Sequence, residues 1–406
     1  MLGFQRRGSK PTFSTHPQGP NGGVLPLQAH SVDYLRGGLD EHRRRLRMVH
    51  EAERCLFVST YYVEHDEHGH SFLRELCTAA QRGVYVVLVI DAFGDKLGRF
   101  SATPALRREQ EDLLSQLRTD GAHVIITQPQ GTLMRALGGG NHIKVQLADA
   151  TEAIVGSSNV SGRSWRQWNE RALLVKGSVV VSLRHWVCEV FGFSFPPEVV
   201  ADLTPEQAEP QQTIELVWDD PTRGQPACWP LTNRVNQLTE HLLTALSQAQ
   251  RCVSVTSFYF KPTAKLAAAL KALSARGVSV TVLHSHRDAL AESDLPWRGA
   301  ATAYCSLLRH GVRIFESFRG EHSKILCIDE DWVAIGSYNF EHAAHDRLAE
   351  AMWCSRDKTL AKQVHDDIRT LCAGPETQEV TQATLAAMSW RDKISNILVR
   401  PVAQWL

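Results

Sequence analysis

The chain has 406 residues, which exceeds the usual size of a domain built on one hydrophobic core, so two domains or two halves are expected. Lys and Arg total 44 and Asp and Glu total 44, and this balance argues against a protein that binds a nucleic-acid duplex, because such proteins usually carry a basic excess. The nine cysteines form no paired CxxC motif, which argues against a disulfide framework or a zinc ribbon and favours a reducing compartment.

The chain begins with a lead, 1–25, that is rich in Gly, Pro and Ser and is expected to be flexible. This lead has no continuous apolar segment of the kind that a secretory signal needs. A first half is expected over 26–200. Its opening elements are predicted as a helix over 35–53, a strand over 55–58, a helix over 71–82 and a strand over 84–90. The second of these strands is apolar throughout, as in strands buried on both faces, so the segment is expected to be a βαβ unit.

A histidine-rich run, His-Asp-Glu-His-Gly-His, occupies 65–70 between the first strand and the second helix. Its residue types are compatible with metal binding. Its glycine, its polarity and its position between two elements fit an exposed loop better, so we expect a loop without metal.

A linker that contains Pro205 and Pro210 is expected over 201–212, followed by a second half over 213–378. The run 214–218 is predicted to open this half as an edge strand. A strand over 251–256, a helix over 264–276 and a strand over 278–283 then repeat the order of the first half, which indicates duplication of a half.

The tail, 379–406, is expected to form an amphipathic helix, because Trp390, Ile394, Ile397 and Leu398 recur at helical spacing. This helix could cover the core, or it could lie at a membrane surface with its tryptophan at headgroup level and its cations near anionic lipid. The apolar loop 131–138, just before His142, could line an entrance for acyl chains or could pack on the core. No segment approaches the roughly 20 apolar residues that a membrane span needs.

One motif occurs twice in the chain. His142 and Lys144 followed by Asp149 have the pattern His-x-Lys-x4-Asp, and His322, Lys324 and Asp329 repeat it. Matching residues follow each copy: Gly156, Ser157, Asn159 and Glu170 in the first, and Gly336, Ser337, Asn339 and Glu350 in the second. The offset between the copies is constant, since 322 − 142, 336 − 156 and 350 − 170 all equal 180. Such a constant register across polar and glycine positions is hard to obtain by chance.

Alternation of apolar and polar residues places each His and Lys on one face of a strand, and each Gly-Ser-x-Asn segment follows a second apolar run and fits a turn. The imidazole of a histidine can be a nucleophile or exchange protons near neutral pH, and a lysine ammonium offers charge and three donors to a phosphate oxygen. Two such sets around one pocket would suit a phosphodiester. A metal site is less expected there, because protonated lysines repel a cation.

These residues resemble the paired motifs of the phospholipase D superfamily, and over about 30–375 the order of elements is most similar to that of bacterial cardiolipin synthases. The resemblance implies two pseudo-symmetric α/β halves, each a mixed sheet flanked by helices, with the active site at their interface and a covalent phosphohistidine in the reaction. It implies that Glu170 and Glu350 orient the histidines. Asp149 and Asp329 are expected to be structural.

The implied reaction is transfer of a phosphatidyl group between phosphatidylglycerol molecules. His142 would attack the phosphorus and His322 would act as acid and then base; Lys144, Lys324, Asn159 and Asn339 would bind the phosphate oxygens, with hydroxyls from Ser157 and Ser337. In one departure from the family pattern, the serine five residues after the asparagine is present as Ser164 but replaced by Ala344 in the second copy. A phospholipid hydrolase, a synthase that uses another alcohol such as ethanolamine, and a nuclease of the same fold remain alternatives.

The resemblance implies no metal and no cofactor. It implies a phospholipid substrate, phosphatidylglycerol. With the cysteine usage and the balanced charge, we expect a cytoplasmic protein held peripherally at the inner face of the cell membrane, with no nucleic-acid partner. The sequence leaves the oligomeric state open.

Overall fold

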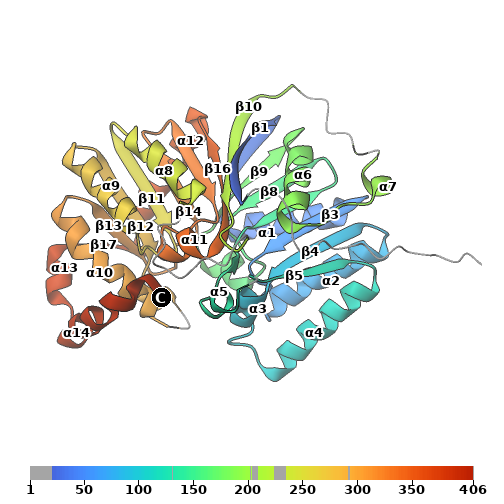
Figure 1. The fold of residues 1–406 in the computed structure, drawn as a ribbon, viewed down its shortest axis with the longest axis horizontal. Helices are drawn as coiled ribbons and strands as arrows, with labels where there is room; N and C mark the ends of the chain where they lie inside the picture. The colour runs from blue at the N-terminus through green and yellow to red at the C-terminus, as the bar shows by residue number, and fades with distance from the viewer. Residues whose placement is uncertain are drawn as a thin grey trace, which may run out of the picture.

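The structure is a computed structural model and describes residues 21–129, 131–201, 203, 209–223, 235–290 and 293–405. These residues form two mixed β-sheets flanked by helices, which confirms the expected pair of α/β halves (Figure 1). The first sheet has the order β2-β9-β8-β7-β3-β4-β5. Its strands are β2 (Ser31–Arg36), β3 (Cys55–Thr60), β4 (Tyr85–Asp91), β5 (His123–Thr127), β7 (Val145–Ala148), β8 (Glu152–Gly156) and β9 (Arg171–Lys176).

The second sheet has the order β1-β10-β16-β15-β14-β11-β12-β13-β17, with β6 beside β16. Its strands are β1 (Gly22–Ala29), β6 (Gly140–Asn141), β10 (Gln212–Asp219), β11 (Cys252–Ser257), β12 (Ser279–Ser285), β13 (Arg313–Ser317), β14 (Lys324–Ile328), β15 (Trp332–Gly336), β16 (Leu348–Ser355) and β17 (Thr377–Val380). In both sheets, the strand that begins at or directly after the motif lysine, β14 or β7, pairs antiparallel with the first strand of its βαβ unit, β11 or β3.

Helices surround the sheets and pass between them. Those of the first half are α1 (Gly38–Glu51), α2 (Glu67–Gln81), α3 (Ala92–Gly98), α4 (Pro104–Thr119), α5 (Thr132–Ala136), the short π-helix η1 (Arg163–Gln167), α6 (Val179–Phe191) and α7 (Pro197–Val200). Those that follow are α8 (Gln237–Ser247), α9 (Ala264–Ala275), the 3-10 helix η2 (Arg287–Ala289), α10 (Leu295–Arg309), α11 (His342–Asp346), α12 (Lys358–Ala373), α13 (Gln382–Ala387), α14 (Trp390–Val399) and the 3-10 helix η3 (Arg400–Trp405). Side-chain caps begin several of them, such as Asp66 for α2 and Thr263 for α9.

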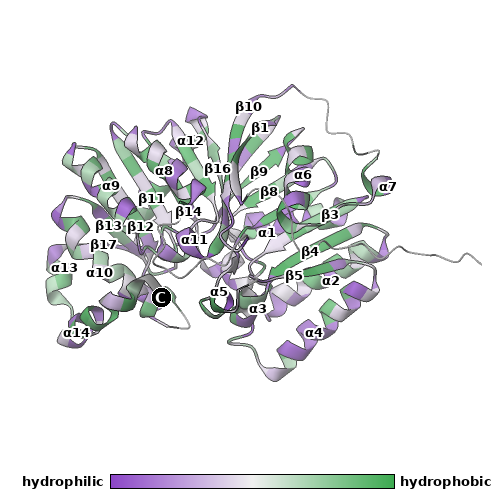
Figure 2. Cartoon of the chain, viewed as in Figure 1, coloured by the Kyte–Doolittle hydropathy of each residue, from purple (hydrophilic) through white to green (hydrophobic). Residues whose placement is uncertain are grey.

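Three apolar clusters hold the layers together. One joins α1 and α2 to the outer face of the first sheet, and another joins α8, α9 and α10 to the outer face of the second. The third lies between the sheets and takes residues from both of them, together with α6 and α12. Figure 2 shows the resulting apolar strands between helices whose outer faces are more polar. Because the central cluster is shared, the two halves form one continuous core rather than two separate domains.

The strand β1 changes the expected division of the chain. It pairs along its full length with β10 and therefore belongs to the second sheet, whereas the next strand, β2, belongs to the first. The expected boundary between lead and first half, after residue 25, falls inside β1, and 1–20 lie outside the described residues. The run 214–218 is not an edge strand, because β10 is paired on one side with β1 and on the other with β16. The pattern of the run could not reveal its partner, which lies almost 190 residues earlier in the chain.

The histidine-rich run is not an exposed loop. His65 and His70 are buried, and 67–70 form the first turn of α2, because the Asp66 side chain accepts a hydrogen bond from Gly69 N at 2.7 Å. His70 Nδ1 lies 3.1 Å from a carboxylate oxygen of Glu109 on α4. The run is therefore part of the packing between α2 and α4.

Both ends of the second half also differ from their expected bounds. Of the expected linker, 202 and 204–208 lie outside the described residues, and its last residue begins β10. The tail boundary at 378 falls inside β17, and the tail forms α13, α14 and η3 rather than one helix. None of the described helices is long and apolar enough to span a bilayer.

Candidate active site

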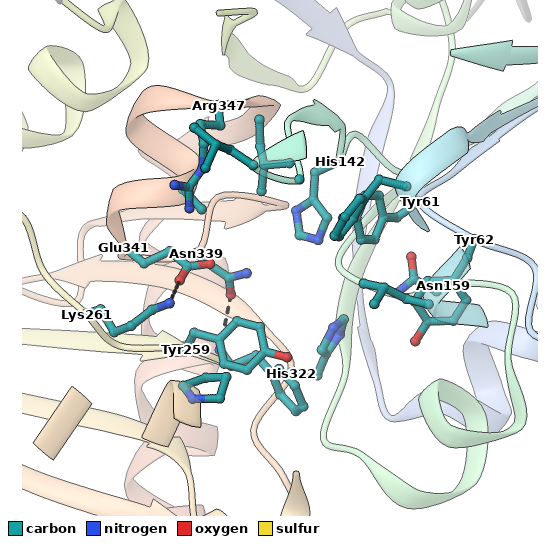
Figure 3. A pocket seen from close by; sticks show the side chains of 18 of the residues that line it. Tyr61, Tyr62, His142, Asn159, Tyr259, Lys261, His322, Asn339, Glu341 and Arg347 are labelled. Atoms are coloured by element: carbon teal, nitrogen blue, oxygen red, sulfur yellow. Dashed lines mark hydrogen bonds and ion pairs between the residues drawn. The ribbon is translucent and has the colours of Figure 1, made fainter. Parts of the chain in front are cut away.

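A cavity of about 350 Å³ lies where the two halves meet. Both motif histidines, His142 and His322, and both motif asparagines, Asn159 and Asn339, line it, and both histidines project into it (Figure 3). The remaining lining residues are Tyr61, Tyr62, Phe93, Leu97, Leu137, Gly138, Arg163, Trp168, Phe258, Tyr259, Lys261, Pro296, Glu341, Ala343, Arg347 and Leu348. The structure thus brings together the two imidazoles that are 180 residues apart in the sequence.

The backbone of each histidine is held by the opposite half. His142 N donates to Ala349 O at 2.9 Å, and His322 N donates to Asn169 O, also at 2.9 Å. These acceptors precede Glu350 and Glu170 and have the same offset of 180, since 349 − 169 = 180. The pseudo-twofold relation therefore extends to the hydrogen bonds that position the site.

The two buried motif glutamates also contact the histidine of the opposite half. Glu350 Oε1 lies 2.9 Å from His142 Nδ1, and Glu170 Oε1 lies 2.7 Å from His322 Nδ1. Both glutamates are fully buried. Glu350 accepts a hydrogen bond from His142 Nδ1–H, which fixes the tautomer in which Nε2 carries the lone pair. Glu170 lies at ion-pair distance from His322 Nδ1. Each half therefore supplies one histidine and the carboxylate that orients the other half's histidine.

The charges around the rings favour neutral imidazoles. Burial lowers the pKa of His142 and of His322 well below the ordinary value of 6.5, and the nearby Lys144 and Lys324 lower it further. Burial also lowers the pKa of Lys324 to about 8, and it raises the pKa of Glu350 to about 8. A neutral imidazole with a free Nε2 is the form that can act as a nucleophile.

The two lysines lie behind the histidines and are not among the residues that line the cavity. Lys144 Nζ donates to His142 O at 2.7 Å, and Lys324 Nζ donates to His322 O. Both lysines are fully buried. In this arrangement they place positive charge directly beneath the histidines, whereas the asparagines face the cavity.

The predicted phosphate-binding role of Ser157 and Ser337 is not supported by their contacts. Ser157 Oγ donates to Glu170 Oε2 and Ser337 Oγ donates to Glu350 Oε2, and neither serine lines the cavity. Each hydroxyl therefore holds the carboxylate that orients a histidine and is not placed to bind a phosphate. The sequence pattern suggested the wrong partner because serine and glutamate are 13 residues apart and meet only through the pairing of neighbouring strands.

The structure explains what the serine at 164 does and what the alanine at the equivalent position 344 lacks. Ser164 is buried, and its Oγ accepts a hydrogen bond from Asn159 N at 3.2 Å. Ala344 is buried in the apolar cluster of the second sheet. Ser164 also hydrogen-bonds Glu170, so its hydroxyl holds both the turn and the carboxylate beside His322, and Ala344 in the second half offers no such hydroxyl.

The motif aspartates lie at the far end of the strands. Both have positive φ, 52° for Asp149 and 55° for Asp329, in tight turns. Asp149 accepts hydrogen bonds from the backbone N–H groups of 53, 54 and 55 at 2.8–3.0 Å, and Asp329 accepts from those of 250, 251 and 252 at 2.7–2.9 Å. These contacts fix the start of β3 and of β11 and place the aspartates outside the cavity.

Aromatic side chains that the motif analysis did not identify enclose the histidines. The Tyr61 ring meets His142 edge-on with centroids 4.9 Å apart, whereas Trp168 stacks on His322 at 4.7 Å and Phe258 meets it edge-on at 4.8 Å. The available signal was positional, because Tyr61 and Phe258 each directly follow the first strand of a βαβ unit. The cavity wall also holds the charged residues Arg163, Lys261, Glu341 and Arg347.

Among the described residues, one group has metal-ligand geometry, with ligand atoms of Cys252, Glu330 and His365 within 4.8 Å of one another. These residues are partly exposed and lie around the start of β11 with Asp329, away from the cavity, and Lys362 Nζ is 3.8 Å from Glu330. The cavity itself presents two imidazoles above two lysines, a donor set that suits an anion better than a cation.

Comparisons with known proteins agree with this architecture. Cardiolipin synthase B of Escherichia coli strain K12 is 23% identical over 390 residues, which covers 91% of this chain and 87% of that protein. Cardiolipin synthase of Geobacillus sp. strain WCH70 is 26% identical over 303 residues, 72% of this chain and 56% of that one. Among solved structures, phosphatidylserine synthase of Haemophilus influenzae Rd KW20 matches with a TM-score of 0.70 at 15% identity, covering 94% of this chain and 96% of that chain.

A family model described as "Cardiolipin synthase, PLD-like domain" matches 46–186 and 242–372, one match in each half. Each match contains one His-x-Lys-x4-Asp motif with its asparagine and its glutamate. The chain therefore belongs to the phospholipase D superfamily, within the cardiolipin synthase-like family.

Proposed function

We propose that this protein is a phosphatidyltransferase of the cardiolipin synthase type, which transfers a phosphatidyl group from one phosphatidylglycerol to another. The single observation that carries the proposal is the crossed pair of His–Glu contacts around one cavity, with a buried lysine beneath each histidine. This arrangement suits a phosphodiester, because it combines two groups that can exchange protons or attack phosphorus with fixed positive charge. The family supports a phospholipid as the substrate.

The geometry supports a reaction in two steps. His142 Nε2 attacks the phosphorus, the bond from phosphorus to the glycerol oxygen breaks, and His322 gives its proton to that oxygen. The hydroxyl of a second phosphatidylglycerol then loses its proton to His322, its oxygen bonds to phosphorus, and the bond from phosphorus to His142 breaks. A bound phosphodiester favours the protonated form of His322 that the first step requires, because its negative charge offsets the neighbouring lysines.

The other motif residues have supporting roles in this scheme. Asn159 and Asn339 face the cavity and donate to phosphate oxygens, whereas Lys144 and Lys324 stabilise the developing negative charge from behind the histidines. Glu350 and Glu170, held by Ser337 and Ser157, keep Nε2 of each histidine turned to the phosphorus. The assignment of His142 as the nucleophile rests on the resemblance to the family, since the two halves are pseudo-symmetric.

The test is to incubate the purified protein with phosphatidylglycerol vesicles and to identify the lipid products by mass spectrometry. We expect cardiolipin and free glycerol. His142→Ala and His322→Ala should each reduce turnover by at least about a thousandfold, because each removes a group that forms or breaks bonds. His310→Ala, at an exposed histidine far from the motifs, is the control. Phosphatidic acid as the sole product would identify a hydrolase, and turnover retained in either active-site variant would refute the two-histidine scheme.

We also propose that the protein docks on the inner face of the cell membrane through α14. This helix packs on α10, whose Pro296 lines the cavity, so the surface lies beside the cavity. Its outer side is apolar: Trp390, Ile397 and Leu398 are each about 70% exposed. The cation Arg391 lies over the Trp390 ring, as expected at a headgroup layer. All eight cysteines that the structure describes are free, which fits the reducing side of the membrane.

Vesicle flotation tests this contact. Joint replacement of Ile394, Ile397 and Leu398 by Ser should reduce the fraction bound to phosphatidylglycerol vesicles by at least about tenfold, because three partly inserted apolar side chains are lost. Ile126→Ser, at an exposed isoleucine on β5, is the control and should bind as the wild type does. Equal flotation of the triple variant and the wild type would contradict docking through α14.

A further inference from the structure

A group of three charged side chains forms one wall of the cavity beyond the two motifs. Lys261, Glu341 and Arg347 come from the second half and line the cavity, and each is no more than 5% exposed. Lys261 Nζ lies 2.7 Å from Glu341 Oε2, and Glu341 is also the largest electrostatic partner of Arg347. Figure 3 shows the three side chains on the same side of the cavity, facing the histidines.

The corresponding wall of the first half is built differently. There Glu64 follows β3, as Lys261 follows β11, and it pairs with Arg163 at 2.5 Å, so the order of charges is reversed. The position equivalent to Arg347 is Gln167, since 347 − 180 = 167. The second-half wall therefore presents two cations and one carboxylate to the cavity, whereas the equivalent positions of the first half hold Glu64 and Gln167.

Burying charged groups at a cavity wall is costly, and an anionic ligand beside two buried cations offsets part of that cost. Burial lowers the pKa of Arg347 from its ordinary value of 12.5, although the nearby Glu341 and Asp346 act against that shift. A charged group in this state is stabilised by an anion that enters the cavity. The motif histidines and lysines already account for one phosphate, so the wall indicates a second anionic group.

The proposed transfer supplies such a group. The acceptor phosphatidylglycerol carries its own phosphodiester, which is joined to the reacting hydroxyl by the three carbons of glycerol. When that hydroxyl lies at the phosphorus between the histidines, the acceptor phosphate must lie within one glycerol length, in the same cavity. Water or a small neutral alcohol brings no second anion.

We propose that Arg347 and Lys261 form a second phosphate subsite, which binds the phosphodiester of the acceptor lipid, while Glu341 accepts a hydrogen bond from the middle hydroxyl of the bridging glycerol. The inference rests on the proposed function. Lys261 belongs to the same segment after β11 as Phe258, which contacts His322. Arg347 O accepts from Gly140 N, two residues before His142, so the subsite is flanked by both histidines. In that step the acceptor oxygen bonds to phosphorus, the bond from phosphorus to His142 Nε2 breaks, and the acceptor proton passes to His322 Nε2.

The experiment sets two acceptors in competition. Phosphatidylglycerol vesicles are incubated with the full chain in the presence of ethanol, and cardiolipin and phosphatidylethanol are measured together. Both products arise from the same donor and the same first step, and only the acceptor of cardiolipin carries a phosphate. Arg347→Gln and Lys261→Gln should each lower the ratio of cardiolipin to phosphatidylethanol by roughly 10- to 100-fold, since each removes a charged partner of the acceptor phosphate. Arg347→Lys keeps the charge and should restore part of the ratio.

Lys265→Gln is the matched control, because Lys265 lies four residues from Lys261 but is exposed and pairs with Glu240. Its product ratio should equal that of the wild type. An unchanged ratio in both Arg347→Gln and Lys261→Gln, or an equal fall of both products in both variants, would overturn the second subsite. Wild-type protein that forms neither product would instead refute the proposed function, so the two failures are distinguishable.

Discussion

Replacement of Glu350 by Gln tests the crossed arrangement directly. The carboxylate is fully buried, accepts a hydrogen bond from Ser337 Oγ and lies 2.9 Å from His142 Nδ1. Gln keeps the size and one acceptor oxygen but cannot become the carboxylate that stabilises His142 as positive charge develops on its ring. A charged hydrogen bond contributes roughly twice as much as a neutral one, and its effect is larger in a buried site. We expect a loss of about 2–4 kcal/mol of transition-state stabilisation, which corresponds to roughly 30- to 1,000-fold in rate.

The stability of the fold should change little in this variant. Burial raises the pKa of Glu350 to about 8, so the ionised carboxylate is disfavoured in the folded protein, and a neutral amide avoids that cost. We therefore expect a Tm within a few degrees of the wild type, which separates the kinetic effect from unfolding.

Product formation from phosphatidylglycerol gives the rate, and intact-protein mass spectrometry after rapid quenching gives the fraction of phosphorylated histidine. Glu350→Gln should slow formation of that species, whereas Glu170→Gln should act through His322 and the proton transfers. Glu152→Gln is a control at a carboxylate that is also buried but interacts with Lys176 at 3.9 Å, outside the site. Equal rates for Glu350→Gln and Glu152→Gln would refute the orienting role of Glu350.

Two further predictions follow from the charged residues of the motifs. The pKa of Lys324 is lowered to about 8, so its ammonium is lost as the pH rises through 8; kcat/KM should fall above that pH, and Lys324→Arg should move this limb to higher pH, whatever its effect on the maximum rate. A basic limb that stays in place in Lys324→Arg would assign it to another group. Asp329→Ala should lower the free energy of unfolding in urea by about 2–4 kcal/mol, because three backbone N–H groups lose a charged acceptor and Ala must adopt a positive φ. Asp329→Asn should lose less, since Asn keeps an acceptor and tolerates that φ, and equal losses in the two variants would contradict this account.

Several helices and strands could be predicted because local runs of apolar residues and turn glycines specify them. The apolar run after Gly83 and the equivalent run after Gly277 became β4 and β12, each buried and parallel to the strand before it. The helix starts were less accurate. The helix predicted from residue 71 begins at Glu67, because the Asp66 cap and the close packing of Gly69 on Glu64 O decide where the first turn forms. These are contacts between neighbouring elements, which residue periodicity does not report.

The sequence alone identified the two histidines and the two asparagines that meet at the cavity, because a His-x-Lys-x4-Asp motif repeated at an offset of 180 places chemically matched side chains at equivalent points of two similar sheets. Only the tertiary structure determined which side chains and strands contact one another. Glu350 of the second half contacts His142 of the first half, and Ser157 and Ser337 donate to Glu170 and Glu350. The strand β1 pairs with β10 and so belongs to the second sheet. The charged wall of Lys261, Glu341 and Arg347 was likewise visible only in three dimensions. Strand pairing and the burial of charge depend on segments far apart in the chain, and no local pattern specifies which of them will meet.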